Sequence, residues 1–489
     1  MTKSKIFWVS FVFCFFAYNV ALEGAEHDRA PKKEPQYLTV ENEEIYKSTT
    51  EEKDKGAQQM IKEPVAPPLV VHELVQTLHE EKEEKSVALS GDDERLRPKE
   101  QFQIPIGDSL LSISGELSFE ADSKINRNLD STKNRDKVEL VPEFELDFLL
   151  AFPQGFILFA EVSLEDEVTL ENGEKAVNEF EDQPQLEEAF AQIPRFLFPE
   201  NILRLGRQQF FESRRWLFDD RLDSIRFLID LSPISFDFSL STEWDFISYA
   251  SYQIAEKASI SGYVIVRNQE PFGDEDQIWV GFRSIGTVKK KNTNIKYWAE
   301  GAYVDGKTLQ KKGAQDINGF AIDLGGTFIF RKQPLKPGFT FGYAFGSGDN
   351  NPGDGVEHNF RQTGLQSNKS KFGGVSNFEY YGVALDPELS NLHIITAGFG
   401  VRPFIKASVD LVYHYYLQHK PSIMIRAFGI RANPTGLDRN LGQEIDLIVG
   451  YKGIKNTKLR FKSGYFIPNR GFVENDNAFR CKFDIKFAF

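Results

Sequence analysis

The chain has 489 residues, a formal net charge of −14 and a mean hydropathy of −0.38. A bundle of membrane helices is excluded, because each helix would need roughly 20 consecutive apolar residues. The acidic balance also argues against a nucleic-acid surface, which needs clustered Lys and Arg.

The first segment in chain order, residues 1–25, has the pattern of a secretory signal peptide. Two lysines precede an uncharged apolar run over residues 6–20, and small residues follow at Ala21 and Ala25. This order of charge, apolar run and small residues predicts export from the cytoplasm. Cleavage after either alanine remains open. The mature chain then keeps Cys481 alone, so no intramolecular disulfide is expected.

Residues 26–100 form a polar extension in the sequence. They contain charge runs such as residues 80–85, a Pro-rich patch at 64–68 and few aromatic residues. This composition predicts a largely flexible periplasmic extension. Within it, apolar residues from Leu69 to Leu78 recur at roughly helical spacing, so a short partner-binding or plug helix is the alternative.

From residue 109 to the end, the hydrophobic pattern has a period of two. The last strand shows it best, because alternate residues are apolar from Phe479 to Phe489 while Arg480, Lys482 and Lys486 occupy the other parity. A strand that spans a membrane in a barrel alternates in this way between lipid and lumen. The terminal aromatic residue is characteristic of bacterial outer-membrane barrels.

Similar alternation recurs in about seventeen stretches, and even strand numbers are the rule, so we expect about 18 strands. A soluble sandwich or propeller would also alternate. The signal peptide, the aromatic-rich apolar parity and Phe489 together favour an all-β transmembrane antiparallel barrel over residues 101–489. The 44 Phe against three Met suit a lipid-facing wall. The predicted location is the bacterial outer membrane, in contact with the bilayer and lipopolysaccharide.

Two segments rich in Gly, Asn, Asp and Pro interrupt the strands, at residues 346–374 and 433–442. We interpret them as long loops. Such loops usually face the outside, and some fold inward to narrow the pore.

Several local motifs over roughly residues 109–489 resemble the alginate export family. Their order and joint presence carry the resemblance. The motifs are Leu205-Gly206-Arg207-Gln208 with Asp223-Ser224-Ile225-Arg226, Phe345-Gly346-Ser347-Gly348-Asp349 with Phe360-Arg361-Gln362-Thr363-Gly364-Leu365, Tyr380-Tyr381-Gly382 with Pro387-Glu388-Leu389-Ser390-Asn391, and Leu437-Asp438-Arg439-Asn440-Leu441-Gly442-Gln443-Glu444-Ile445-Asp446. The resemblance implies a monomeric barrel of about 18 strands that exports an anionic polysaccharide through an Arg-rich constriction. A periplasmic export complex is the partner to expect.

Arginine suits such a constriction, because its guanidinium stays charged and offers paired donors to carboxylates. By strand parity, Arg226 faces the lumen, opposite to Ile225 and Phe227. Parity also favours Arg204 as a lumen residue, whereas the family resemblance favours Arg207. Both assignments stay open at this point.

Four further cations complete the candidate conduit. Arg480 and Lys482 face inward by parity, and Arg361 and Arg439 line the pore if their loops fold inward. An ordinary lumen charge paired with a neighbouring carboxylate is the alternative for each. The seven candidate pore-lining residues are Arg204, Arg207, Arg226, Arg361, Arg439, Arg480 and Lys482.

A hydrolytic site was weighed on one strand, where Ser408, Asp410 and His414 share a parity. Residues two and four apart on a strand lie about 7 and 13 Å apart, too far for direct hydrogen bonds between nucleophile and base. A cation bound by Asp349 and Asp354 is a weaker alternative. We therefore predict no catalytic residues, no metal site, no cofactor and no enzymatic activity.

The sequence predicts an outer-membrane channel that exports an anionic polysaccharide of the alginate type. A general or small-solute porin is the alternative. The export reading requires a narrow passage lined by cations, whereas a porin would have a wider lumen of mixed charge.

Overall fold

The computed structural model describes residues 102–489, apart from residues 134–135, 172–173, 181–183, 269–275, 311–312, 352 and 372. The predicted signal peptide and the polar extension lie outside the described residues. Within the described part, no helix has the length and apolarity that a membrane crossing requires.

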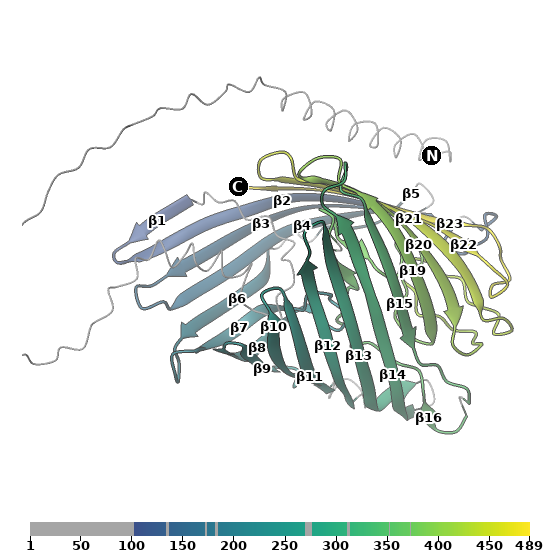
Figure 1. Ribbon diagram of the computed structural model, residues 1–489, viewed down its shortest axis with the longest axis horizontal. Helices are drawn as coiled ribbons and strands as arrows, with labels where there is room; N and C mark the ends of the chain where they lie inside the picture. Colours follow the sequence, from purple (N-terminus) through teal and green to yellow (C-terminus); the bar gives the residue numbers. More distant parts are fainter. Residues whose placement is uncertain are drawn as a thin grey trace, which may run out of the picture. The chain divides into compact units, whose positions relative to one another are not determined.

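Eighteen long strands build one wall, and each pairs antiparallel with the next strand of the wall in chain order (Figure 1). The period-two alternation explains why these segments form strands, and the turn residues between them explain where each strand ends. The strands are β2 (Ser109–Ile125), β3 (Lys137–Ala151), β4 (Ile157–Glu171), β6 (Gln185–Pro194), β7 (Asn201–Phe211), β8 (Asp219–Leu231), β9 (Ile234–Ser241), β10 (Phe246–Ala255), β11 (Ala258–Asn268), β12 (Asp276–Lys289), β13 (Thr293–Gln310), β14 (Gly313–Phe330), β15 (Gly338–Gly346), β19 (Leu392–Val401), β20 (Ala407–Gln418), β21 (Asn440–Tyr451), β22 (Thr457–Pro468) and β23 (Ala478–Ala488).

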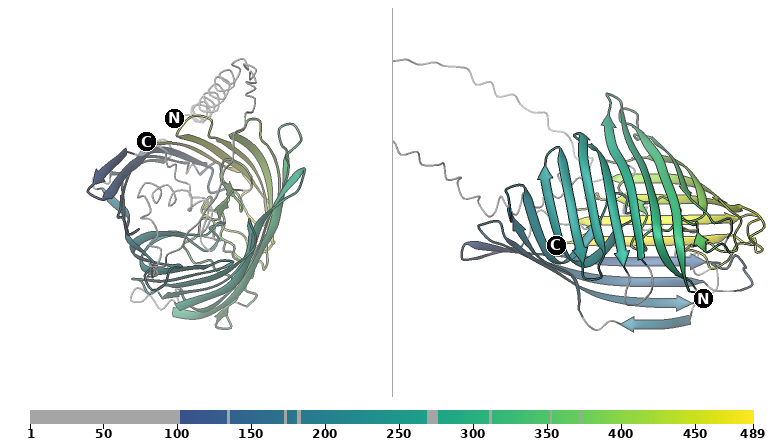
Figure 2. Two further views of the ribbon diagram at one scale, coloured as in Figure 1. Left: turned by 60° about the vertical axis from the view of Figure 1, so that its left-hand side comes forward. Right: turned by 90° about the horizontal axis from the view of Figure 1, so that it is seen from below.

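The wall closes where β2 pairs with β23, from Glu116 opposite Ala488 to Ile125 opposite Phe479. Phe489 extends this ladder, because its backbone exchanges two hydrogen bonds of 3.0 Å with Gly115. Closure pairs the two edge strands of the wall with each other, as a spanning sheet requires. The predicted transmembrane β-barrel of about eighteen strands is confirmed, and Figure 2 shows its strands curving around a lumen.

The two faces of the wall differ as the alternation predicts. Outward side chains are apolar and exposed, such as Ile225 at 56%, Phe341 at 57% and Leu411 at 52% exposure. Inward side chains next to them are polar and buried, such as Arg226 on β8 and His414 on β20. The apolar surface therefore faces the side that lipid covers.

The two ends of the barrel differ in the length of their connections. One end, the turn end, carries short turns such as residues 152–156 and 290–292. The other, the loop end, carries long connections, above all residues 347–391 and 419–439. In outer-membrane barrels, short turns face the periplasm and long loops the outside. The turn end is accordingly the periplasmic end.

Five shorter strands lie beside the wall strands. β1 forms a hairpin with β2 at the turn end, and β5 pairs with the loop-end half of β4. The remaining three belong to the connection between β15 and β19. Their bounds are β1 (Phe102–Ile106), β5 (Glu174–Phe180), β16 (Val356–Glu357), β17 (Lys369–Ser370) and β18 (Phe378–Glu379).

Candidate functional site

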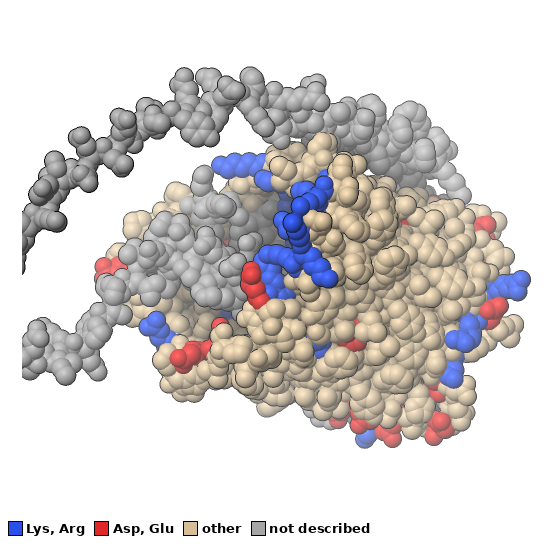
Figure 3. Space-filling model, viewed as in Figure 1, with Lys and Arg blue, Asp and Glu red and all other residues tan. Residues whose placement is uncertain are grey.

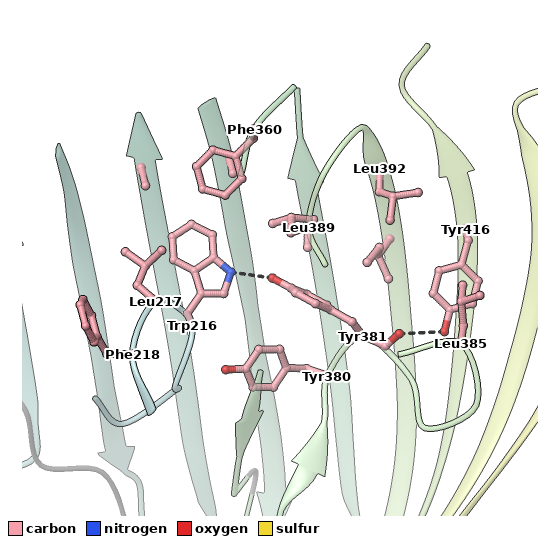
Figure 4. Packing of buried hydrophobic residues seen from close by; sticks show 14 of the residues in the cluster. Trp216, Leu217, Phe218, Phe360, Tyr380, Tyr381, Leu385, Leu389, Leu392 and Tyr416 are labelled. Atoms are coloured by element: carbon pink, nitrogen blue, oxygen red, sulfur yellow. Dashed lines mark hydrogen bonds between the residues drawn. The ribbon is translucent and has the colours of Figure 1, made fainter. Parts of the chain in front are cut away.

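The lumen is the candidate site, and residues 347–391, here called the inner loop, fold into it. Most of its described aromatic and aliphatic side chains are buried, including Phe360 at 0%, Tyr381 at 2% and Leu385 at 0% exposure. Figure 4 shows these side chains against residues of the short β7–β8 connection and of the wall. A loop with so much apolar surface is stabilised by burial, so it occupies the lumen instead of extending into water.

A hydrogen-bonded chain ties the inner loop to the β7–β8 connection and to β14. The indole Nε1 of Trp216 donates to Tyr381 Oη at 2.6 Å, and Tyr381 Oη donates to Asp323 Oδ2 at 2.8 Å. Figure 4 shows the first of these bonds. Three segments far apart in sequence are thereby held at one point in the lumen.

Asp323 also belongs to a buried cluster of five charged groups. Arg214 contacts Asp323 at 2.7 Å and Glu300 at 3.7 Å. Arg283 contacts Glu212 at 2.9 Å and hydrogen bonds to Glu300 through Nε at 2.8 Å. Two cations and three carboxylates interleave, so each buried charge has an opposite neighbour, as burial in low dielectric requires.

Glu212 fixes the turn that carries Arg214 and Trp216. Its carboxylate accepts hydrogen bonds from the backbone N–H groups of Arg214 at 2.7 Å and Leu217 at 3.2 Å, and from that of Trp216. A side chain therefore satisfies the backbone donors of a turn buried inside the barrel. This explains why an irregular segment is tolerated at this depth.

Farther along the wall, two carboxylates on β21 receive the inner loop. Glu444 accepts from the backbone N–H groups of Ala384 at 2.5 Å and Leu385 at 2.9 Å, and Asp446 accepts from Val383 at 3.2 Å. A glycine on β22, Gly464, makes room for this contact, because a Cβ there would lie 2.6 Å from the backbone nitrogen of Ala384.

The β20–β21 loop closes over the same part of the inner loop. The backbone N–H of Phe428 donates to the carbonyl of Asp386 at 3.0 Å, and the N–H of Glu388 donates to the carbonyl of Arg426 at 2.9 Å. The inner loop is therefore held between the wall and a second loop.

Glu379 anchors the inner loop to β22 through an ion pair with Lys462 at 2.8 Å. Burial raises the pKa of the Glu379 carboxyl, but the nearby charges of Lys462, Lys369 and Lys482 outweigh burial and lower that pKa below its ordinary value. The carboxylate form is therefore the one that holds the loop.

Arg226 on β8 and Arg204 on β7 are paired in the register of these adjacent strands, and both side chains lie on the inner face of the wall. Arg226 forms a bidentate pair with Asp237 at 2.6–3.1 Å and stacks 4.6 Å above the Phe210 ring. Arg204 donates to the neutral amide oxygen of Gln192 at 2.7 and 3.1 Å. The carboxylate of Asp237 thus offsets the charge of Arg226.

Arg207 lies on the opposite face of β7 from Arg204. It is opposite Asp223 in the register, and the two side chains lie 3.6 Å apart and are 41% and 51% exposed. Strand parity favoured Arg204 and the family resemblance favoured Arg207 as the lumen residue. The register agrees with strand parity. Arg207 is consequently not placed to line the lumen.

Arg480 and Lys482 lie on the inner face of β23. Arg480 forms a bidentate pair with Asp122 at 2.8–3.1 Å and reaches the inner loop through Asp386 at 2.9 Å. Lys482 lies 3.8 Å from Asp122. Both cations therefore sit where wall and inner loop meet.

Arg361 and Arg439 occupy different settings. Arg361 lies within the inner loop and pairs with Glu357 at 2.6 Å, while its carbonyl accepts from the Trp279 indole at 2.8 Å. Arg439 is exposed at the loop end, where its Nε donates to the carbonyl of Gln418 at 2.6 Å. Only Arg361 is carried inward with the inner loop.

Two prominent lumen arginines were missed at the sequence level. Arg283 alternates with the exposed residues Val280 and Phe282 on β12, so parity could have identified it. Arg214 lies outside the regular strands, and no local pattern predicts that its turn enters the barrel.

The inner face of β2, β3, β4 and β6 is acidic. Asp147, Glu161 and Glu188 occupy one row across β3, β4 and β6, and Glu116 lies opposite Glu145 in the neighbouring pair of strands. The lumen therefore combines acidic and basic surfaces.

The residues weighed as a hydrolytic site bind different partners. Ser408 Oγ accepts from the backbone N–H of Val375 at 2.8 Å, Asp410 pairs with Arg402 at 2.9 Å, and His414 Nδ1 lies 2.9 Å from Thr396 Oγ1. Ser408 and His414 are thus engaged in separate contacts.

Asp349 and Asp354 accept hydrogen bonds from backbone N–H groups two residues further on, at 2.8 and 3.0 Å. Among the residues that the structure describes, no three His, Cys, Asp or Glu side chains gather as metal ligands. The two aspartates thus stabilise their own turns.

Comparison with known proteins agrees with this architecture. The alginate export family model matches residues 233–477, which is half of the chain. The chain belongs to the alginate export family. The resemblance inferred from the sequence motifs is thereby confirmed.

Two curated relatives are similar over part of the chain. The alginate production protein AlgE of Pseudomonas aeruginosa is 30% identical over 226 residues, covering 40% of this chain and 44% of that protein. AlgE of Azotobacter vinelandii is 27% identical over 186 residues, covering 33% and 37%. The matches span less than half the length of either relative.

Solved structures share the fold at low sequence identity. The outer membrane protein OprD of Pseudomonas aeruginosa has a TM-score of 0.52 and 13% identity, covering 83% of this chain and 97% of that chain. OccK5 of the same organism has a TM-score of 0.51 and 11% identity, covering 77% and 98%. These likenesses show a barrel of the outer-membrane type.

Proposed function

We propose that this barrel exports an anionic polysaccharide of the alginate type from the periplasm to the outside. The observation that carries the proposal is a basic strip on the inner faces of β22 and β23. These two strands place six cations and one carboxylate, Asp484, toward the lumen. The cations are Lys458, Arg460, Lys462, Arg480, Lys482 and Lys486.

Like charges face each other within the strip, because Lys458 is opposite Lys486 and Lys462 is opposite Lys482. Such pairs are destabilising unless anions lie near them. Carboxylates of other segments supply part of the compensation, since Lys486 reaches Glu116 at 2.5 Å. A polyuronate, with one carboxylate per sugar, would supply the same kind of group from inside the lumen.

The carboxylate partners also suit transport. A conduit must attract the polymer and still release it, so its sites need to be numerous and individually weak. Arg226 with Asp237 and Arg480 with Asp122 are held in fixed positions by their partners. Fixed and partly compensated cations would give a polyanion short-lived contacts as it slides.

A small-solute porin is the second candidate, and the acidic row of Asp147, Glu161 and Glu188 favours it. A lumen with neighbouring acidic and basic surfaces would also suit small polar solutes. Polysaccharide export needs a passage beside the inner loop that is wide enough for a polymer chain. Passage of small ions needs less width.

Single-channel currents in planar bilayers would test the proposal with polymannuronate and neutral dextran. We expect polymannuronate to block the current and dextran of the same length to leave it unchanged. Replacing one lumen cation, in Arg204→Gln or in Lys482→Gln, should weaken the block about fivefold, corresponding to about 1 kcal/mol.

Arg207→Gln is the matched control, because Arg207 lies on the same strand as Arg204 but on the outer face. Its block should equal that of the wild type. Indifference of the wild-type current to polymannuronate, together with a large conductance, would reject polysaccharide export and leave the porin.

A further inference from the structure

The turn end has a one-sided charge distribution that the lumen does not explain. Four turns, residues 290–292, 331–337, 402–406 and 452–456, contain nine Lys and Arg and no Asp or Glu. We call these four turns the basic ledge. Figure 3 shows Lys and Arg side chains gathered at this end of the barrel.

The remaining turns of this end provide the contrast. Residues 107–108, 152–156, 195–200, 232–233 and 256–257 together contain two cations and three carboxylates. The excess of positive charge is therefore confined to the arc from β12 to β22. A general need for lysines at a membrane surface would spread them around the whole rim.

Backbone hydrogen bonds join the ledge into one continuous structure. The N–H of Arg331 donates to the carbonyl of Asn292 at 2.9 Å, that of Arg402 to Leu335 at 2.6 Å, and that of Lys452 to Lys406 at 2.8 Å. Adjacent turns thus support one another. The barrel itself therefore sets the backbone positions from which these cations extend.

Most of these cations point into solvent. Lys290, Lys291, Lys332, Lys336 and Lys406 are all exposed. Exposed cations of one sign attract a polyanion over roughly one Debye length, about 8 Å at physiological salt. Several of them together raise the rate of encounter with an anion.

The ledge is continuous with the basic strip of the lumen. Its last turn, residues 452–456, leads directly into β22, whose first inward cation is Lys458. The backbone N–H of Ala488 bonds to the carbonyl of Asn456 at 2.9 Å, which joins this turn to the end of β23. A polymer bound on the ledge would meet Lys458 and Lys486 next.

We infer that the basic ledge is a docking surface for the anionic polysaccharide before it passes into the lumen. The inference rests on the proposed function and adds the step that precedes it. The ledge would capture the chain from the periplasm, and the strip on β22 and β23 would then receive it. The ledge ends at the turn from which β22 of the strip begins.

The test uses the four-residue ledge variant Lys290→Gln/Lys291→Gln/Lys332→Gln/Lys336→Gln in planar bilayers. Polymannuronate is added from the turn side, and the frequency and duration of blocking events are recorded. At low salt, the ledge variant should show about a tenfold lower event frequency, within the range of electrostatic steering. The duration of each event should stay unchanged, because the lumen is intact.

The matched control removes four cations from the loop end, in Lys133→Gln/Lys307→Gln/Lys420→Gln/Arg470→Gln. Its event frequency from the turn side should equal that of the wild type. Raising the salt to 0.5 M should remove most of the difference between ledge variant and wild type, because it shortens the Debye length. Equal frequencies at low salt would overturn the ledge inference while leaving polysaccharide export in place.

A wild-type channel that polymannuronate does not block would reject the export function, and binding then tests the ledge by itself. Fluorescence anisotropy of labelled polymannuronate is measured with the full chain in phosphatidylcholine nanodiscs. About tenfold weaker binding by the ledge variant would support the docking surface. Equal binding would overturn it and assign the ledge to anionic lipid headgroups or an acidic protein.

Discussion

Tyr381 and Asp323 are joined by a hydrogen bond of 2.8 Å that ties the inner loop to β14 of the barrel wall. Trp216 donates to the same phenol oxygen, and Arg214 contacts the same carboxylate oxygen of Asp323. The position of the inner loop therefore depends on side chains from three segments. Single hydrogen bonds at this point therefore help to hold the inner loop in the lumen.

Tyr381→Phe should loosen the inner loop, because it removes the donor to Asp323 and the acceptor for Trp216. A typical hydrogen bond contributes about 1 kcal/mol, so the undocked population should rise about fivefold for each bond lost. We expect larger current fluctuations in single-channel recordings. Tyr343→Phe is the control, since Tyr343 bonds to His393 at 2.8 Å away from the inner loop. Equal noise in the two variants would contradict the assigned role of Tyr381.

Gly464→Val should displace the inner loop by occupying the space that it needs. A Cβ at this position would lie 2.6 Å from the backbone nitrogen of Ala384 and 2.7 Å from Glu444. The three backbone donors of residues 383–385 could then no longer reach Glu444 and Asp446, and the mean conductance should increase.

Gly262→Val is the control for this change, because Gly262 is exposed and a Cβ there would have its nearest neighbour at 4.0 Å. Its conductance should remain that of the wild type. A Gly464→Val channel with unchanged conductance would mean that residues 383–385 do not limit the passage.

Most of the fold could be predicted from the alternation of apolar and polar residues along the strands. The period-two pattern of β23 predicted both its apolar outer face and the inward positions of Arg480 and Lys482. Closure could also be expected, because lipid offers no partner for an open sheet edge. Alternation predicts the direction of a side chain because each residue of a wall strand faces either the lipid or the lumen.

The docking of the inner loop could not be predicted in the same way. Alternation places Glu444 and Asp446 in the lumen, but their partners are backbone N–H groups of residues 383–385, which carry no side-chain signal. The turn that holds Arg214 likewise depends on Glu212, which a local pattern does not reveal. Contacts between loop backbone and wall side chains are tertiary. The sequence pattern therefore predicted that the loops are long but not where they dock.

The Glu379–Lys462 pair predicts acid-dependent release of the inner loop. Because the pKa of Glu379 is lowered in the folded barrel, its contribution to docking is present above the ordinary value near 4.5 and is lost as the pH falls through the lowered pKa. Conductance should therefore be constant from pH 7 to pH 5 and rise only below about pH 4.

Glu379→Gln should remove the contribution of this ion pair and raise the conductance already at pH 7. Asp223→Asn serves as the control, because Asp223 pairs with Arg207 on the outer face of the wall, away from the inner loop. A Glu379→Gln channel whose conductance follows the same pH curve as the wild type would assign the acid response to other carboxylates.

The Arg226–Asp237 pair allows structural and conducting roles of a lumen arginine to be separated. Asp237 is 1% exposed, and Arg226 provides its bidentate partner. Arg226→Ala would leave a buried carboxylate without that partner, which costs about 3 to 5 kcal/mol in such pairs. Urea unfolding of the barrel in detergent micelles should show most of this loss in the free energy of unfolding, because Asp237 is buried in the folded barrel.

Asp237→Asn adds the decisive comparison, because the double variant Arg226→Ala/Asp237→Asn removes both charges together. It should recover much of the stability lost in Arg226→Ala, as the penalty comes mainly from the uncompensated carboxylate. Polymannuronate block measured on the double variant then reports on the arginine's charge in a barrel of near-normal stability. A block equal to that of the wild type would limit Arg226 to holding β8 and β9 together, and a weaker block would give it a part in the conduit.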